Sequence, residues 1–160
     1  MYARIIKTAS ASATVSLAVA LIGCGGDGGA TTEEIPSCEN RGDMYFAGIA
    51  KTTDDGIATV QLTSAAPAPP ANSYTNDWDL MVTDATTGAP LEGAVVVAAP
   101  YMVDHGHGAP NVIADDMGGG DYVIDPLSLK MNGLWDVTIK VTPAGGAETR
   151  MVFSFCVLPL

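Results

Sequence analysis

The chain has 160 residues, 48% of them hydrophobic, which suffices for one packed domain and a leader. Its 18 Asp and Glu against 7 Lys and Arg give a net charge of -11, so the chain lacks the basic surface that grips nucleic-acid phosphates. The 18 Gly and 10 Pro favour turns over long helices. This composition predicts an all-β domain.

The N-terminal residues are typical of a targeting segment. Two basic residues precede an apolar run that is too short, and too rich in Ser and Thr, to predict a membrane-spanning helix. The run ends in Leu21-Ile22-Gly23-Cys24, which resembles a bacterial lipobox. Residues 1–23 are therefore predicted to be a lipoprotein signal peptide, with Cys24 carrying the lipid that anchors the protein to a membrane. The alternative is an ordinary secretory leader with a chance cysteine.

Either interpretation places the mature chain outside the cytoplasm, and the lipid anchor places it in the cell envelope, facing the periplasm. Residue Gly25 is not the Asp that retains some lipoproteins in the inner membrane, so the outer membrane is preferred. Residues 24–43 are predicted to be a flexible tether, because the stretch after Cys24 is Gly, Thr and Glu with little to bury. The folded domain is predicted to span residues 44–158.

Two cysteines remain once Cys24 is assigned to lipid. Cys38 and Cys156 lie near opposite ends of the domain, in a compartment where disulfides persist. We predict that they pair, and a bridge closing so long a loop stabilises by about 4 to 5 kcal/mol in the chain-entropy model. Two free buried thiols are the alternative.

Extended patterns begin at Met44. Residues 44–49 and 57–63 predict a hairpin around the turn Asp54-Asp55-Gly56. The Pro-rich residues 65–71 cannot join a ladder and are predicted to cross to another sheet or edge. Residues 78–83 predict the next strand, and the apolar run 94–99 predicts a central strand buried on both sides.

The second half continues in the same way. Residues 111–114 predict a short strand, residues 115–121 a turn, and residues 122–127 another strand. Clear alternation over residues 135–141 and in the last strand turns one set of side chains to the core: Trp135, Val137, Ile139, Val141, Met151, Phe153, Phe155 and Val157. Cys156 then lies on the opposite face. About seven or eight antiparallel strands predict an immunoglobulin-like β-sandwich.

The stretch Pro100–Pro110 contains both histidines of the chain. His105 and His107 flank a glycine, so we predict an exposed loop in which both rings reach one metal ion. Imidazoles with Asp104 suit Cu(II) or Zn(II), and Met102, Met117 or Met131 would supply sulfur for Cu(I). Two alternatives stay open: the histidines hydrogen-bond to backbone carbonyls and fix the loop, or the loop binds a partner.

Several short motifs, taken in order, resemble the YtkA-like domain family. They are Asn76-Asp77-Trp78, Gly88-Ala89-Pro90, Met102 with His105-Gly106-His107-Gly108, Gly120-Asp121-Tyr122, and Met131-Asn132-Gly133-Leu134-Trp135. The resemblance implies an immunoglobulin-like sandwich at the bacterial envelope, related in outline to FixH-type proteins and met alongside copper and cytochrome oxidase machinery. Many members carry a second methionine just before the histidines. Here Val103 and Asp104 stand there, which leaves a mixed nitrogen and oxygen site more open.

No enzymatic activity is predicted. No cysteine is left as a nucleophile, no serine lies in a Gly-x-Ser-x-Gly elbow, and no phosphate-binding glycine loop precedes a helix. The first hypothesis is a lipid-anchored module that binds copper through the histidine loop for delivery, buffering or sensing. The second is a metal-free structural or interaction module that contacts an envelope protein.

Overall fold

The computed structural model describes residues 37–160. The predicted signal peptide, Cys24 and most of the predicted tether lie outside these residues. Within the described part of the chain, no helix has the length and apolar character needed to cross a membrane.

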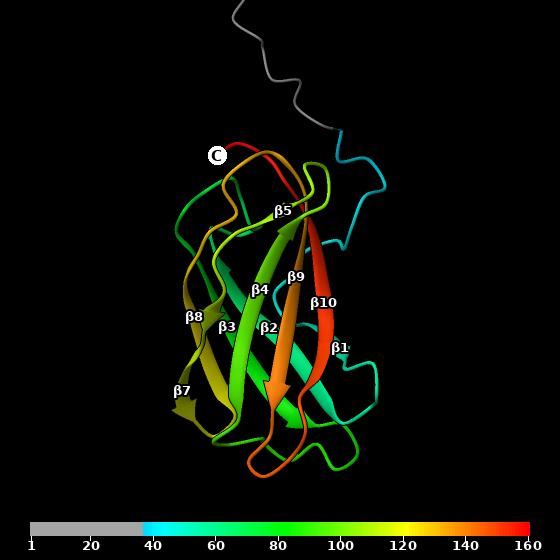
Figure 1. The fold of residues 1–160 in the computed structure, drawn as a ribbon, viewed down its shortest axis with the longest axis vertical. Helices are drawn as coiled ribbons and strands as arrows, with labels where there is room; N and C mark the ends of the chain where they lie inside the picture. The colour runs from blue at the N-terminus through cyan, green and yellow to red at the C-terminus, as the bar shows by residue number, and fades with distance from the viewer. Residues whose placement is uncertain (1–36) are drawn as a thin grey trace, which may run out of the picture. The chain divides into compact units, whose positions relative to one another are not determined.

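The described residues form ten strands in two antiparallel sheets of five strands each (Figure 1). The strands are β1 (Ile49–Thr52), β2 (Ala58–Ala66), β3 (Asn76–Asp84), β4 (Val95–Met102), β5 (His107–Gly108), β6 (Val112–Ile113), β7 (Asp115–Gly118), β8 (Asp121–Leu127), β9 (Gly133–Thr142) and β10 (Thr149–Val157). The count exceeds the predicted seven or eight because the two-residue strand β5 and the edge strand β7 were not expected, whereas β6 lies within the short strand predicted over residues 111–114.

The sheet orders confirm the immunoglobulin-like β-sandwich. One sheet runs β1-β2-β3-β8-β7 and the other β10-β9-β4-β5, with β6 also paired to β4. Without β1, the first order matches strands A-B-E-D of an immunoglobulin domain, and β10-β9-β4 matches G-F-C. The connections that alternate between the sheets bring β4 and β9, distant in sequence, side by side.

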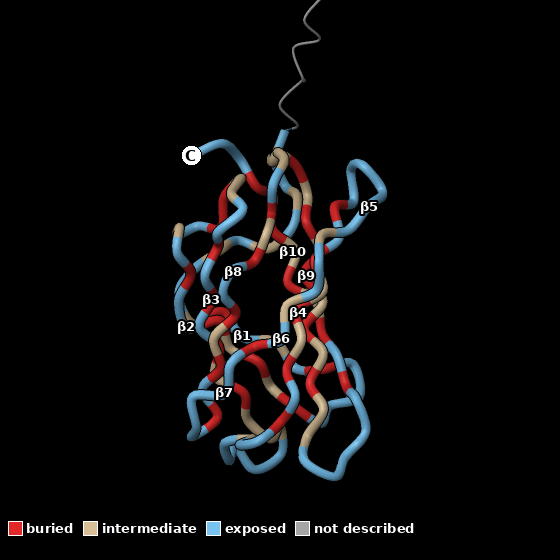
Figure 2. The backbone as a smooth tube through the Cα atoms, turned by 60° about the vertical axis from the view of Figure 1, so that its left-hand side comes forward, coloured by how far each residue is buried: buried red, intermediate tan, exposed pale blue. Residues whose placement is uncertain are grey.

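The core lies between the two sheets, where the inward faces of the strands are buried (Figure 2). In β9 and β10 the eight side chains predicted to face the core are all buried. Trp78 from the opposite sheet meets Phe153 and Phe155 edge-on, with ring centres 6.2 and 5.6 Å apart. Aromatic pairs favour this geometry, so it joins the two sheets at the centre of the domain.

Three local predictions are wrong. Strand β4 is central but alternates between buried and partly exposed side chains, because a sandwich covers only one face of each sheet. The Pro-rich segment joins β2 to β3, which are neighbours in one sheet. Residues 115–118 form the edge strand β7, paired to β8, although their side chains are exposed and give no apolar signal.

The domain also begins earlier than predicted. Cys38 forms the predicted disulfide with Cys156 of β10. The amide of Asp43 donates to the Ser154 carbonyl at 2.5 Å, and the Asp43 carboxylate accepts the Ser154 amide at 2.8 Å. Residues 37–43, which we call the edge strap, therefore lie along the outer edge of β10 and are not a free tether.

Candidate functional site

The predicted histidine loop is the tip of a β-hairpin. Strand β4 continues through Met102, the chain turns over residues 103–106, and β5 pairs back so that Met102 opposes His107. The Gly106 amide donates to the Met102 carbonyl at 2.9 Å, and Gly106 has φ of 68°, a value that glycine adopts without strain. Figure 2 shows this histidine hairpin (residues 102–108) projecting beyond the sandwich with an exposed tip.

Both imidazoles are exposed and close together. The ring centres of His105 and His107 are 6.0 Å apart, with the planes at 79°. His107 also meets the edge of the buried Trp135 ring, with centres 6.2 Å apart. The hairpin therefore presents one imidazole at its tip and a second one against the rim of the core.

The histidines do not hold the hairpin in shape. Within residues 37–160, the closest polar contact of the His107 ring is its Nδ1 with the Gly108 carbonyl, at the outer limit of 3.5 Å. The turn is held by other groups: the Val103 amide donates to the Leu134 carbonyl at 2.9 Å, and Asp104 is anchored separately. The ring nitrogens thus remain available to a ligand, which favours binding over the purely structural alternative.

Met102 is the cross-strand partner of His107. Residues His107, Met102, Trp135 and Phe155 are successive cross-strand partners, so they form one row on the inner face of the sheet. Met102 has no exposed surface, whereas His107 at the end of the row is exposed. The structure therefore places Met102 beside His107, but with the thioether packed in the core.

Asp104 is engaged by the protein itself. Its carboxylate accepts both terminal nitrogens of Arg41, one at 3.0 Å, and the Leu134 amide at 2.9 Å. The hydrogen bonds from Arg41, and then from the Leu134 amide, hold the pKa of Asp104 below its ordinary value. Asp104 lies beside the predicted ligands, yet its oxygens anchor the turn to the edge strap and to β9.

Two residues that position this site were not found from the sequence. Arg41 lies far from Asp104 in the chain, and no local pattern pairs them. Gly133 has φ of 137°, and an added Cβ would overlap Asp104 Oδ2 and lie 3.0 Å from Met102 Cε. The lack of a side chain at Gly133 makes room for the anchored carboxylate.

The spacing of the two rings fits one shared ion. A ring nitrogen lies about 1.1 Å from the ring centre and binds a late transition metal at about 2.1 Å, so rings sharing an ion have centres about 5 to 6.4 Å apart. The observed 6.0 Å falls within this range. In the described part of the chain, however, no group of three or more His, Cys, Asp or Glu side chains is arranged to hold a metal. Within those residues, no third His, Cys, Asp or Glu side chain completes a donor set with the imidazole pair.

These features define an immunoglobulin-like module that carries its free donor groups on one exposed hairpin. Residues 54–140, more than half of the chain, match the model of the YtkA-like family, so the chain belongs to that family and the resemblance is confirmed. Membership identifies an extracytoplasmic, envelope-associated module. No curated protein and no solved structure matches the chain significantly.

Proposed function

We propose that this protein is a lipid-anchored, non-catalytic module that binds copper through the histidine hairpin, for delivery, buffering or sensing. One observation carries the proposal: the imidazoles of His105 and His107 are exposed, their ring centres are 6.0 Å apart, and within residues 37–160 their one hydrogen-bond contact is the 3.5 Å approach of His107 Nδ1 to the Gly108 carbonyl. A chain with two histidines in all has placed both on one rigid turn.

The donor set defines which metal the site favours. Two imidazoles suit Cu(II), and Met102, the cross-strand partner of His107, would add a soft thioether for Cu(I) once it leaves its packing in the core. Bound copper would supply a redox-active or transferable ion, while the hairpin holds the two rings at the required separation. We leave Asp104 out of the proposed ligand set, because Arg41 and Leu134 already use its oxygens.

Titration of the purified protein with Cu(I) and Cu(II), under competition from a chelator of known affinity, tests the proposal. We expect one equivalent to bind in the native chain, and His105→Ala with His107→Ala to remove that equivalent. Met117→Leu is the matched control, since Met117 is 66% exposed on β7, away from the site. Unchanged affinity in the double variant would overturn the proposal.

Anchoring through Cys24 belongs to the same proposal and is supported by the lipobox-like sequence that precedes it. We propose placement in the outer membrane, since Gly25 replaces the Asp of inner-membrane retention. Mass spectrometry of the N-terminal peptide is expected to show diacylglyceryl and acyl groups on Cys24. An unmodified N-terminus beginning elsewhere would contradict it, and fractionation of the two membranes tests the placement.

A metal-free interaction module is a second candidate, favoured by an apolar outer face. Val95 and Tyr101 on β4 are 54% and 47% exposed, and Ile113 on β6 is 72% exposed. Exposed apolar side chains gathered on one sheet face are typical of surfaces that contact another protein. This candidate predicts that protein isolated from its host contains no copper and that crosslinks to an envelope protein form through β4 and β6.

A further inference from the structure

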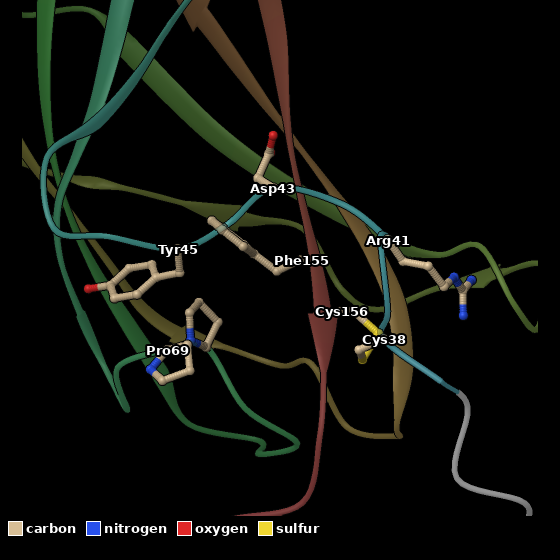
Figure 3. Close-up of a pocket in the computed structure, with 8 residues that line it drawn as sticks. Cys38, Arg41, Asp43, Tyr45, Pro69, Phe155 and Cys156 are labelled. Carbon is tan, nitrogen blue, oxygen red and sulfur yellow. A yellow bond between two sulfur atoms is a disulfide. The ribbon is translucent and has the colours of Figure 1, made fainter.

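The edge strap links the disulfide to the histidine hairpin. It starts at Cys38, bonded to Cys156 on β10, and three residues later Arg41 reaches across to Asp104 in the hairpin turn. Figure 3 shows Arg41 extending from the strap away from Tyr45 and Pro69, with the disulfide beside it. The disulfide thus joins the strap to β10, and the ion pair joins the strap to the histidine hairpin.

The strap is held most firmly on the side of Asp43. There the Asp43 carboxylate accepts Lys51 Nζ at 2.5 Å as well as the Ser154 amide. Gly42 approaches β10 so closely that an added Cβ would lie 2.5 Å from the Ser154 carbonyl oxygen. On the other side of Arg41, the disulfide is the covalent attachment. Arg41 therefore lies between two attachments of the strap. The hydrogen bonds of Asp43 persist when the disulfide is reduced, whereas reduction removes the attachment at Cys38.

A small reductant has room to approach the disulfide. Cys38 and Cys156 are partly exposed, and both line a hollow of about 170 Å³ shared with Tyr45, Pro69 and Phe155 (Figure 3). The hollow opens beside the strap, so the sulfur atoms are not sealed inside the core. A reductant can therefore reach this disulfide in the folded protein, unlike a disulfide that only unfolding would expose.

We propose that the Cys38–Cys156 disulfide sets the metal affinity of the histidine hairpin, with Arg41 as the positioning residue that transmits its state through Asp104. The inference rests on the proposed function, whose site it regulates. A dithiol reductant carries out the switching step: its thiolate attacks one sulfur, the Sγ–Sγ bond breaks, and one cysteine leaves as a thiolate. The second thiolate of the reductant then attacks the reductant's own sulfur in the mixed disulfide and releases the other cysteine. Two thiols form on this protein, and the reductant leaves as a disulfide.

The direction of the effect follows from the geometry. With the bridge closed, Arg41 is held against Asp104, and the turn that carries His105 stays fixed. With the bridge open, residues 37–41 are free to fray, the exposed ion pair weakens, and the rings must be ordered when the metal binds. An exposed pair of this kind corresponds to a change of about two- to fivefold in metal affinity.

The test compares four forms of the full-length protein: native, Cys38→Ser with Cys156→Ser, Arg41→Met, and all three changes together. Remaining thiols are alkylated first so that they cannot bind metal. Hydrogen exchange at the amides of Gly106 and Ala109 reports on the hairpin without metal, and Cu(II) titration reports on affinity. Arg150→Met is the matched control, since Arg150 faces Asp54 at 3.9 Å, away from the hairpin.

We expect the cysteine pair variant and Arg41→Met each to speed hairpin exchange several-fold and to weaken Cu(II) binding about two- to fivefold. The combined variant should add little, because both changes break the same connection. Arg150→Met should change neither measurement. If hairpin exchange changes in these variants but the native protein binds no Cu(II), the coupling is supported and the proposed function is overturned.

The proposal is overturned if hairpin exchange and Cu(II) affinity are the same in the native and cysteine variants, or if the effects of bridge loss and Arg41→Met simply add. Should the cysteine variant not fold, Arg41→Met keeps the bridge and decides the matter. Unchanged hairpin exchange in Arg41→Met removes the connection on which the regulation depends.

Discussion

Two hairpins of similar composition differ in how the fold holds them. The histidine hairpin and the β7–β8 hairpin (residues 115–121, the glycine hairpin) each contain a methionine, an aspartate and glycines. Met102 is fully buried, whereas Met117 is 66% exposed. Asp116 accepts only backbone amides, from Gly93 at 2.9 Å and Gly118 at 2.8 Å, while Asp104 also binds Arg41 from the disulfide-bonded strap.

The comparison shows that residue type alone does not define a candidate metal site in this protein. In both hairpins the aspartate serves the backbone, so acidity is a poor guide to metal ligands. The histidine hairpin differs from the glycine hairpin because it is anchored to the core and to the edge strap. It also carries two exposed imidazoles that do not hold the turn in shape. A donor that is held in place but unpaired is the better candidate ligand.

The methionine pair gives the largest expected contrast. Met102→Ala removes a fully buried side chain between Trp135 and His107 and is expected to lower the free energy of unfolding by about 3 kcal/mol. Met117→Ala should change it by less than about 0.5 kcal/mol, because that side chain is exposed. Urea denaturation of both variants measures the contrast, and equal losses would mean that the two hairpins are anchored alike.

The glycine pair comes next. Gly133→Ala forces a side chain onto Asp104 at φ of 137°, and we expect a loss of about 2 kcal/mol in the free energy of unfolding. Gly119 has φ of 65° with nothing within 4 Å of an added Cβ, so Gly119→Ala should cost about 1 kcal/mol from backbone strain alone. A larger loss at Gly119 would show that the crowding around Asp104 is not a real constraint.

The smallest effect concerns pH. The folded-state pKa of Asp104 lies below its unfolded value, so its stabilising contribution is present above that unfolded value, about 3.9, and is lost as the pH falls through the folded pKa. Asp104→Asn should therefore destabilise at pH 7, by under about 1 kcal/mol, and much less near pH 2. Thermal unfolding from pH 7 to pH 2 measures this, and parallel curves for the two proteins would contradict the assigned ion pair.

The fold could be predicted where the pattern repeats. Strict alternation placed Trp135 and Phe155 in the core and Cys156 on the opposite face, and the compartment argument paired Cys156 with Cys38. Strand β7 was missed because edge strands with exposed side chains carry no apolar signal.

The site could be predicted only in part. Both histidines stand out in the sequence because the chain contains no others. The role of Asp104 could not be found there, since its partner Arg41 reaches it only through the folded strap. The burial of Met102 was equally hidden, because β4 extends three residues beyond the apolar run that predicted it.

The proposed site is tested most directly by counting the imidazoles bound to Cu(II). Pulsed electron paramagnetic resonance gives this number, because it detects the remote nitrogen of each coordinated ring. Because His105 and His107 are the only histidines in the chain, every imidazole signal belongs to this hairpin. We expect two coordinated imidazoles in the native protein, one in each single alanine variant and none in the double variant. Cu(II) bound without imidazole coupling, or a native spectrum that persists in the double variant, would contradict the proposed site.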